Sequence, residues 1–232
     1  NEGIDILSAG FPCQSFSQAG NNLGFEDPRG KLFFEIPRLI NECRYPPKVI
    51  ILENVGFLKI FDNGSRLRVV INTLRKAGYW IHDNSVAILD AYDYCKSPQK
   101  RERLFIIGVH NKYFKKNHFR FPKPPSNIEH DIWTLISRQK QGPDETYIEP
   151  GNKYELMIRD LIQKHGPDRL YRIRRVEARA SPLNVCPTLT ANMGNGGHNV
   201  PFLVDDWGIR RLTVQECMLL QSIRHGELTF PD

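Results

Sequence analysis

The sequence lacks the features that mark membrane-spanning, exported and disulfide-stabilised proteins. No apolar run approaches the ~20 residues needed to cross a bilayer. The first residues carry neither the basic nor the apolar region of a signal peptide. The five cysteines are an odd number, are widely spaced and form no C-x-x-C pair, which argues against a disulfide framework or a zinc cluster. We therefore expect a cytoplasmic protein with a working thiol and no metal.

What the chain does contain is typical of a globular protein with a polyanionic partner. Its 232 residues suffice for one sizeable core and a second, smaller lobe. Hydrophobic residues make up 40% and charged residues 25%, as in folded domains. The net charge of +6 favours contacts with phosphate groups, although many basic proteins never bind nucleic acid.

Short apolar runs alternate with helical patterns in the first half of the chain. Strands are expected at 4–9, 49–52, 85–89 and 104–109, and helices at 31–43 and from Ser65 onward. Ser65 is expected to cap the second helix and Gly78 to end it. Pro37 either kinks the first helix or belongs to its first turn. Strands alternating with helices predict an α/β fold with a doubly wound, largely parallel sheet.

A change of composition after Lys112 predicts a second lobe. The proline-rich segment 121–126 is typical of a linker. A helical pattern follows near 152–165, and after it come a basic segment and a segment rich in glycine and asparagine. We therefore expect the second lobe to begin at about residue 120.

Three polar motifs coincide with the predicted ends of strands. The first, GFPCQSFS at 10–17, places Cys13 at the end of a strand and in a long polar loop that spans 11–30. The second, ENV at 53–55, ends the next strand, and the third, QKRER at 99–103, leads into the last one. Ligands of doubly wound sheets lie outside the C-terminal ends of the strands, so the first two motifs are candidate site residues.

Each motif taken alone also has an ordinary structural explanation. An isolated cysteine is more often a buried structural residue, and a lone glutamate such as Glu53 is more often a solvated carboxylate. Arg101 and Arg103 alternate, so they are expected on the same side of one strand, where they could form a plain charged edge. The flanking Gly10 and the polar neighbours favour an exposed Cys13.

Together and in this order, the motifs resemble the signature motifs of DNA cytosine-5 methyltransferases of the restriction–modification type. Residues 24–34 are similar to the end of the family's mobile catalytic loop, residues 188–198 to a DNA-contacting loop, and residues 210–221 to the penultimate motif. The resemblance implies a Rossmann-like, here incomplete, methyltransferase fold. It implies a partial catalytic domain at 1–120, a target-recognition domain at 121–205 and a segment at 206–232 that returns to the catalytic domain.

The resemblance implies transfer of a methyl group from S-adenosylmethionine to carbon 5 of a flipped-out cytosine in a specific duplex DNA sequence. Cys13 would add to carbon 6, which makes carbon 5 nucleophilic. Glu53 would contact ring nitrogen 3 and the exocyclic amine. Arg101 and Arg103 would hold the base, and Asn54 would support Glu53 and the loop of Cys13.

Other residues correspond to family positions that contact DNA or the cofactor. The resemblance implies cofactor contacts for Pro12 and Leu32. In the basic segment, arginines can read guanine edges, the alternative being a solvated basic strand. The expected DNA-binding residues are Gln14, Ser17, Arg29, Arg172, Arg174, Arg175, Thr188, Thr190 and Asn192.

Two features of the family are not found in this sequence. One is the glycine-rich loop that cradles the methionine part of the cofactor, and the other is the closing Gly-Asn-x-Val-x-Pro segment. A shortened chain, a stretch of a longer chain, and one half of a split enzyme with a complementing chain all remain open. We expect residues 1–232 alone to bind S-adenosylmethionine weakly or not at all. Alternatives to the enzyme are a DNA-binding module without catalysis and a tRNA cytosine methyltransferase, which would carry a Cys-Phe-Thr element.

Overall fold

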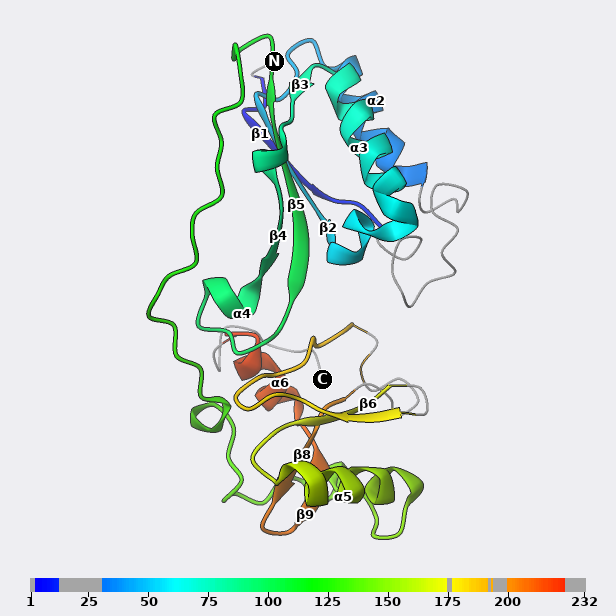
Figure 1. Ribbon diagram of the computed structural model, residues 1–232, viewed down its shortest axis with the longest axis vertical. Helices are drawn as coiled ribbons and strands as arrows, with labels where there is room; N and C mark the ends of the chain where they lie inside the picture. Colours follow the sequence, from blue (N-terminus) through cyan, green and yellow to red (C-terminus); the bar gives the residue numbers. More distant parts are fainter. Residues whose placement is uncertain (1–2, 13–30, 175–176, 192, 194–199, 224–232) are drawn as a thin grey trace. The chain divides into compact units, whose positions relative to one another are not determined.

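The computed structural model describes residues 3–12, 31–174, 177–191, 193 and 200–223 (Figure 1). The chain forms two units: the first comprises 1–90 and 102–124, and the second comprises 91–101 and the chain from Pro125 onward. The boundary after Pro124 falls inside the proline-rich segment predicted as a linker. Two differences from the sequence-based boundaries stand out: 91–101 belongs to the second unit, and so does the described part of 206–232.

The first unit contains a mixed five-stranded sheet. Its strands pair in the order β1-β2-β5-β3, with β4 also on β5. Only β1 and β2 pair in parallel, whereas β2, β3 and β4 all run antiparallel to β5. The bounds are β1 Ile6–Gly10, β2 Val49–Val55, β3 Tyr79–Trp80, β4 Val86–Asp90 and β5 Glu102–His110.

The predicted α/β class is confirmed, and four of the five strands run in the same direction. The sheet is nevertheless less parallel than expected, because β5 lies reversed between β2 and its other neighbours. The physical reason is the short connection 91–101, which returns the chain from β4 directly to its neighbour β5. A parallel pairing would require a crossover of a dozen or more residues.

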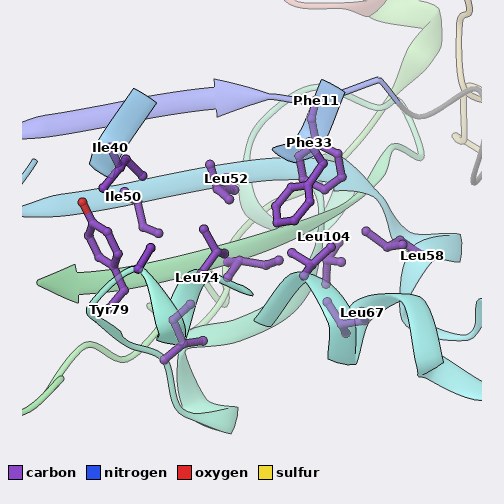
Figure 2. Close-up of a cluster of buried hydrophobic side chains, with 14 residues drawn as sticks. Phe11, Phe33, Ile40, Ile50, Leu52, Leu58, Leu67, Leu74, Tyr79 and Leu104 are labelled. Carbon is purple, nitrogen blue, oxygen red and sulfur yellow. The ribbon is translucent and has the colours of Figure 1, made fainter. Parts of the chain in front are cut away.

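Helices α2 (Glu35–Glu42) and α3 (Ser65–Lys76) cover one face of this sheet (Figure 1). Ile50 and Leu52 of β2 and Leu104 of β5 point into the buried cluster beneath them (Figure 2). Short 3₁₀ turns at Leu32–Phe34, Gly56–Lys59, Phe61–Gly64 and Asp83–Ser85 complete the connections. The second helical layer of a doubly wound sheet is not present among the described residues of this unit.

Local sequence accounts for the ends of both helices. Pro37 lies in the first turn of α2, where it needs no amide hydrogen, and the residues before Glu35 form the separate 3₁₀ turn. The prediction that Ser65 caps α3 is wrong. Ser65 is the first helical residue and its hydroxyl donates to Asp62 Oδ2 at 2.5 Å. Gly78, with φ +94°, follows the end of α3 as predicted.

The second unit contains an antiparallel sheet in the order β7-β6-β8-β9. Helix α5 (Lys153–His165) lies alongside it (Figure 1). The remaining elements are α4 Ala91–Tyr94, β6 Tyr171–Arg174, β7 Glu177–Ala180, β8 Phe202–Asp205, β9 Gly208–Arg211, α6 Val214–Leu220 and 3₁₀ turns at Ile132–Thr134 and Asp144–Thr146. Across the described residues of both units, no helix is long and apolar enough to span a membrane.

Candidate active site and nucleic-acid interface

Three of the predicted motif segments meet at one edge of the first unit's sheet. Because β1 and β2 are parallel, their C-terminal ends coincide, and Gly10 is the register partner of Glu53. Because β5 is antiparallel, it begins where β2 ends, and Val55 is the partner of Arg103. Segments that are more than 40 residues apart in the sequence are therefore neighbours in space.

Glu53 and Arg103 form an ion pair on the face of the sheet away from the helices. Arg103 Nε lies 2.8 Å from Glu53 Oε1, with side-chain exposures of 21% and 39%. The Arg103 Nη1 group also donates to the Glu102 carbonyl at 2.8 Å. A Cβ at Gly10 would lie 3.3 Å from Glu53 Oε2, so the glycine leaves room for the carboxylate. The carboxylate is thus oriented by its partners and still accessible to a ligand.

Asn54 points to the opposite face of β2 and is only 2% exposed. Its Nδ2 group donates to the Phe11 carbonyl at 3.1 Å, and its Oδ1 accepts from the Val55 amide at 2.8 Å. A buried amide that satisfies a distant carbonyl fixes the backbone at that point. Asn54 therefore holds the chain just before the segment that carries Cys13.

The Phe11 and Phe33 side chains pack together in the core, with ring centroids 5.3 Å apart. The segments that carry Pro12 and Leu32 are consequently held side by side. Leu32 is exposed, while Pro12 is partly buried. Both side chains offer an apolar surface and no hydrogen-bonding group, so they fit the apolar contacts of a cofactor but not its charged amino-acid part. The described residues thus account for only part of a cofactor site.

Several predicted site residues lie outside the described residues. They are Cys13, Gln14, Ser17, Arg29, Arg175 and Asn192. Among the described cysteines, Cys186 and Cys217 are buried. Burial raises the pKa of the Cys186 thiol, and the Cys217 thiolate adds to this effect. Burial, together with the charge of Glu216, raises the pKa of Cys217 to about 11. Neither is suited to act as a nucleophile.

The QKRER motif is divided between the two units. Arg103 is a residue of β5, but Arg101 precedes that strand and belongs to the second unit. Its Nη1 group donates to the Leu189 carbonyl at 3.3 Å. The prediction that Arg101 and Arg103 share one side of a strand is therefore wrong, because pairing with a distant segment removes Arg101 from the strand.

That distant segment is 186–189, which pairs with 98–100. The Cys186 amide donates to the Pro98 carbonyl, and the Lys100 amide donates to the Cys186 carbonyl, both at 2.8 Å. The Thr188 hydroxyl donates to the Lys100 carbonyl at 2.7 Å. Thr188, predicted to contact DNA, thus uses its hydroxyl proton inside the protein, whereas Thr190 is exposed.

The two faces of the β6–β7 hairpin differ in character. Tyr171 and Ile173 are buried and pack with residues of α5. The alternating residues Arg172 and Arg174 lie on the opposite face. Their cross-strand partners on β7 are Arg179 and Glu177, respectively. The half-buried Arg172 and the exposed Arg174 thus share one charged face of the hairpin.

The loop with the two threonines lies on the same side of this sheet. Tyr171 and Phe202 are register partners and both face α5, so the next residue along each strand, Arg172 or Leu203, faces the other way. Leu203 belongs to the same buried cluster as Leu189, which lies between Thr188 and Thr190. Two segments predicted independently to bind DNA therefore share one side of the second unit.

Arg179 and Glu177 belong to none of the motifs and were not predicted as site residues. The pattern that could have indicated them is the alternation of charged and small residues in Glu177-Ala178-Arg179-Ala180, which is typical of a half-buried strand. Among the described residues, no cluster of His, Cys, Asp and Glu side chains is suited to hold a metal ion.

Comparison with known proteins identifies the family of the chain. The family model for C-5 cytosine-specific DNA methylases matches residues 1–225. The chain is 40% identical over 221 residues to the Type II methyltransferase M.Bsp6I of Bacillus sp. (strain RFL6), which covers 94% of this chain and 67% of that protein. It is 35% identical over 228 residues to the Type II methyltransferase M.HaeII of Haemophilus aegyptius, covering 98% and 64%.

The fold is also similar to that of solved structures. The crystal structure of the S. pombe Dnmt2 methyltransferase matches with a TM-score of 0.57 and 16% identity, over 97% of this chain and 67% of that one. The chain thus spans about two thirds of the length of the relatives that it matches along most of its own length. On the family model and the sequence identities, the chain belongs to the C-5 cytosine-specific DNA methylase family.

Proposed function

We propose that this chain provides the catalytic and sequence-reading parts of a restriction–modification DNA methyltransferase that acts on carbon 5 of cytosine. The observation that carries the proposal is the Glu53–Arg103 ion pair at the sheet edge where the Cys13 segment begins. An oriented carboxylate with a free oxygen can bind a group that donates two hydrogens. The N3–C4 edge of cytosine is such a group once nitrogen 3 has taken up a proton from solvent, and this proton returns to solvent when the ring is restored.

In the proposed complex, Glu53 binds ring nitrogen 3 and the exocyclic amine of the flipped base. This contact strengthens as the ring gains electron density, so it favours the transition state over the ground state. Arg103 holds the carboxylate in one orientation. Arg101 would contact the base or its neighbours through the guanidinium N–H groups that do not bond the Leu189 carbonyl.

Cys13 is the proposed nucleophile. It lies two residues after Phe11, so chain geometry keeps its Cα within about 7 Å of the Phe11 Cα, whose carbonyl Asn54 holds. Its thiolate would form a bond with carbon 6, and the ring electrons would move to carbon 5. Loss of the carbon 5 proton would later restore the ring and break the carbon–sulfur bond. Bound S-adenosylmethionine supplies the methyl group that carbon 5 takes up.

The target carbon is stacked in a duplex, so the base must leave the helix at a cost of a few kcal/mol. The proposed DNA contacts from the first unit are Gln14, Ser17 and Arg29. The arginines and threonines on one side of the second unit would read the sequence and bind the backbone. The net charge of +6 favours this partner.

A further segment, in the same or a complementing chain, is proposed to complete the cofactor site. Pro12 and Leu32 supply only apolar contacts. Strand β1 is an edge strand in the described sheet, and Ile6 on its uncovered face is 57% exposed. An exposed edge with apolar residues favours pairing with another strand. We propose that the strand that pairs there carries the glycine-rich cofactor loop.

Trapping on duplex DNA that contains 5-fluorocytosine tests the proposal, because fluorine at carbon 5 blocks release of the enzyme. The full-length protein with S-adenosylmethionine should form a covalent adduct, and the Cys13→Ser variant should form none. Cys43→Ser, which changes an exposed cysteine, is the matched control and should be trapped normally. Trapping of Cys13→Ser would refute the assignment of the nucleophile, and trapping on tRNA instead of duplex DNA would refute the substrate.

A further inference from the structure

The β6–β7 hairpin places two arginines directly opposite each other. Arg172 and Arg179 are register partners in this antiparallel pair, so their side chains leave the same face of the sheet. Like charges in directly opposed positions destabilise a hairpin. Among the described residues, no carboxylate forms an ion pair with Arg172. Arg172 itself therefore lacks a counter-charge within the described part of the protein.

The surroundings of Arg172 increase the cost of its positive charge. Burial lowers the pKa of Arg172, and the neighbouring charges of Arg179 and Arg174 lower it further. The opposite face of the hairpin is packed against α5, so the arginines cannot move to that side. Both guanidinium groups remain on one face, where an anion from outside would relieve the repulsion.

Glu177 holds one of the two arginines. Its Oε2 lies 2.6 Å from Arg179 Nη2, and both side chains are more than half exposed. Glu177 is the register partner of Arg174, so it stands beside the arginine pair and not between its members. A carboxylate in this position restricts the rotamers of Arg179 and competes weakly with an incoming anion.

We propose that Arg172 and Arg179 form a two-arginine clamp on one DNA phosphate, and that Glu177 competes weakly with this phosphate for Arg179. This inference rests on the proposed function and assigns Arg172 a backbone contact. A phosphate carries the full negative charge that two opposed guanidinium groups require, whereas a guanine edge offers only neutral acceptors. The clamp would fix the register of the protein on DNA, and Arg174 would remain for base contacts.

Salt dependence separates a phosphate contact from a base contact. We would measure binding of the 232-residue chain to a pool of randomised 24-base-pair duplexes between 50 and 200 mM salt, and sequence the bound fraction. The variants are Arg172→Gln, Arg179→Gln, the double variant and Glu177→Gln. Lys164→Gln, which removes one exposed charge on α5, is the matched control.

The double variant removes the contact to the single phosphate, so it should reduce the slope of log affinity against log salt by about 0.9 and leave the enriched bases unchanged. Over the fourfold salt range, loss of that contact should make the loss of affinity about 3.5-fold smaller. Each single variant leaves one arginine on the phosphate and should reduce the slope by less, Glu177→Gln should bind more tightly at every salt concentration, and Lys164→Gln should match the unmodified chain.

An unchanged slope in the double variant would overturn the clamp, and so would full, additive reductions from the two single variants, because these would mark two separate phosphates. A loss of preference at one base position would also overturn it, because that result marks a base contact. Failure of the unmodified chain to bind duplex DNA would instead count against the proposed function as a whole. The two failures are therefore distinguishable.

Discussion

Two ion-pair systems in this molecule use the same chemistry in opposite environments. In the first unit, Glu53 and Arg103 pair at a sheet edge with side chains 39% and 21% exposed. In the second unit, Arg210 is 2% exposed and lies between Asp205, at 0%, and Glu216, at 13%. The first pair leaves a carboxylate oxygen accessible, whereas the second encloses its charges almost completely.

The buried system is saturated with hydrogen bonds. Arg210 Nε donates to Asp205 at 2.7 Å, and its two Nη groups donate to the Glu216 oxygens at 2.8 Å each. Tyr147 also donates to Asp205, and the Thr213 amide donates to Glu216. Burial alone would lower the pKa of Arg210, but the bonds and charges of Glu216 and Asp205 outweigh it and raise that pKa.

The difference separates an arginine that is enclosed by its partners from one whose ion pair a ligand could reach. A buried charge whose partners are removed is strongly destabilising, whereas an exposed pair contributes little to folding. A half-exposed pair at a strand end costs little to open and can rearrange around a ligand. Burial, not residue type, separates the two roles.

The largest expected effect comes from breaking the buried system. Arg210→Met should lower the free energy of unfolding by about 3–5 kcal/mol, because Asp205 and Glu216 would stay buried without a partner. Urea unfolding measures the change, and Arg103→Met is the control, with an expected loss within about 1 kcal/mol. If Arg210→Met and Arg103→Met lower the free energy of unfolding by similar amounts, burial does not separate the two ion-pair systems.

The next effect concerns catalysis without a change of stability. Glu53→Gln keeps the shape of the side chain but removes the charge proposed to bind the cytosine edge. The rate of methyl transfer in single turnovers of the full-length protein should fall about 10²–10³-fold, as on removal of other groups that stabilise a transition state. The urea midpoint should hardly move, and a matching loss of stability would show that Glu53 has a structural role instead.

A smaller effect is expected for the buried amide that links the two strand ends. Asn54→Ala leaves the Phe11 carbonyl without its donor and should cost about 1–3 kcal/mol of stability. The formation of the covalent adduct with 5-fluorocytosine DNA should also slow, because the backbone before Cys13 is less constrained. Asn117→Ala, which removes an amide that bonds two exposed or half-buried carbonyls, is the control. Normal trapping by Asn54→Ala would show that Asn54 does not position the nucleophile.

The smallest expected effect comes from Gly10→Ala. The new methyl group would lie 3.3 Å from Glu53 Oε2, which can move away because it is the end of a flexible side chain. Stability should change by less than about 1 kcal/mol, and the rate of methyl transfer should fall only a few-fold. Gly151→Ala is the control for crowding near Glu53, because nothing lies within 4 Å of the Cβ position of Gly151. Any loss of stability in this variant would come from the backbone strain of a residue with φ +83°. A larger rate loss for Gly151→Ala than for Gly10→Ala would contradict this explanation.

Local patterns in the sequence predicted most elements of the first unit and the residues of its site. Apolar runs predicted β2 and β5, and the spacing of Leu67, Val70 and Leu74 predicted α3. The order of the three motifs identified the family, which the family model confirms. These predictions succeed because they depend on residues close together in the sequence. They use the periodicity of apolar side chains and residues such as Gly78 that end a helix.

Other features could not be predicted because they depend on contacts between distant residues. The reversed direction of β5, the separation of Arg101 from Arg103, and the position of Arg179 opposite Arg172 all follow from strand pairing. Strand direction and register are set by which segments bury surface together, and the sequence of one segment carries no record of its partner.

By itself, the sequence determined most strands and helices of the first unit and the motifs proposed to carry the chemistry, because short-range sterics and hydrophobic periodicity act within each segment. Only the tertiary structure decided which charged residues are accessible. Arg210 and Arg103 both lie in strands, yet one is enclosed by two carboxylates and the other lies at an open sheet edge. The reason is that desolvation depends on everything packed around a group, most of which comes from other parts of the chain.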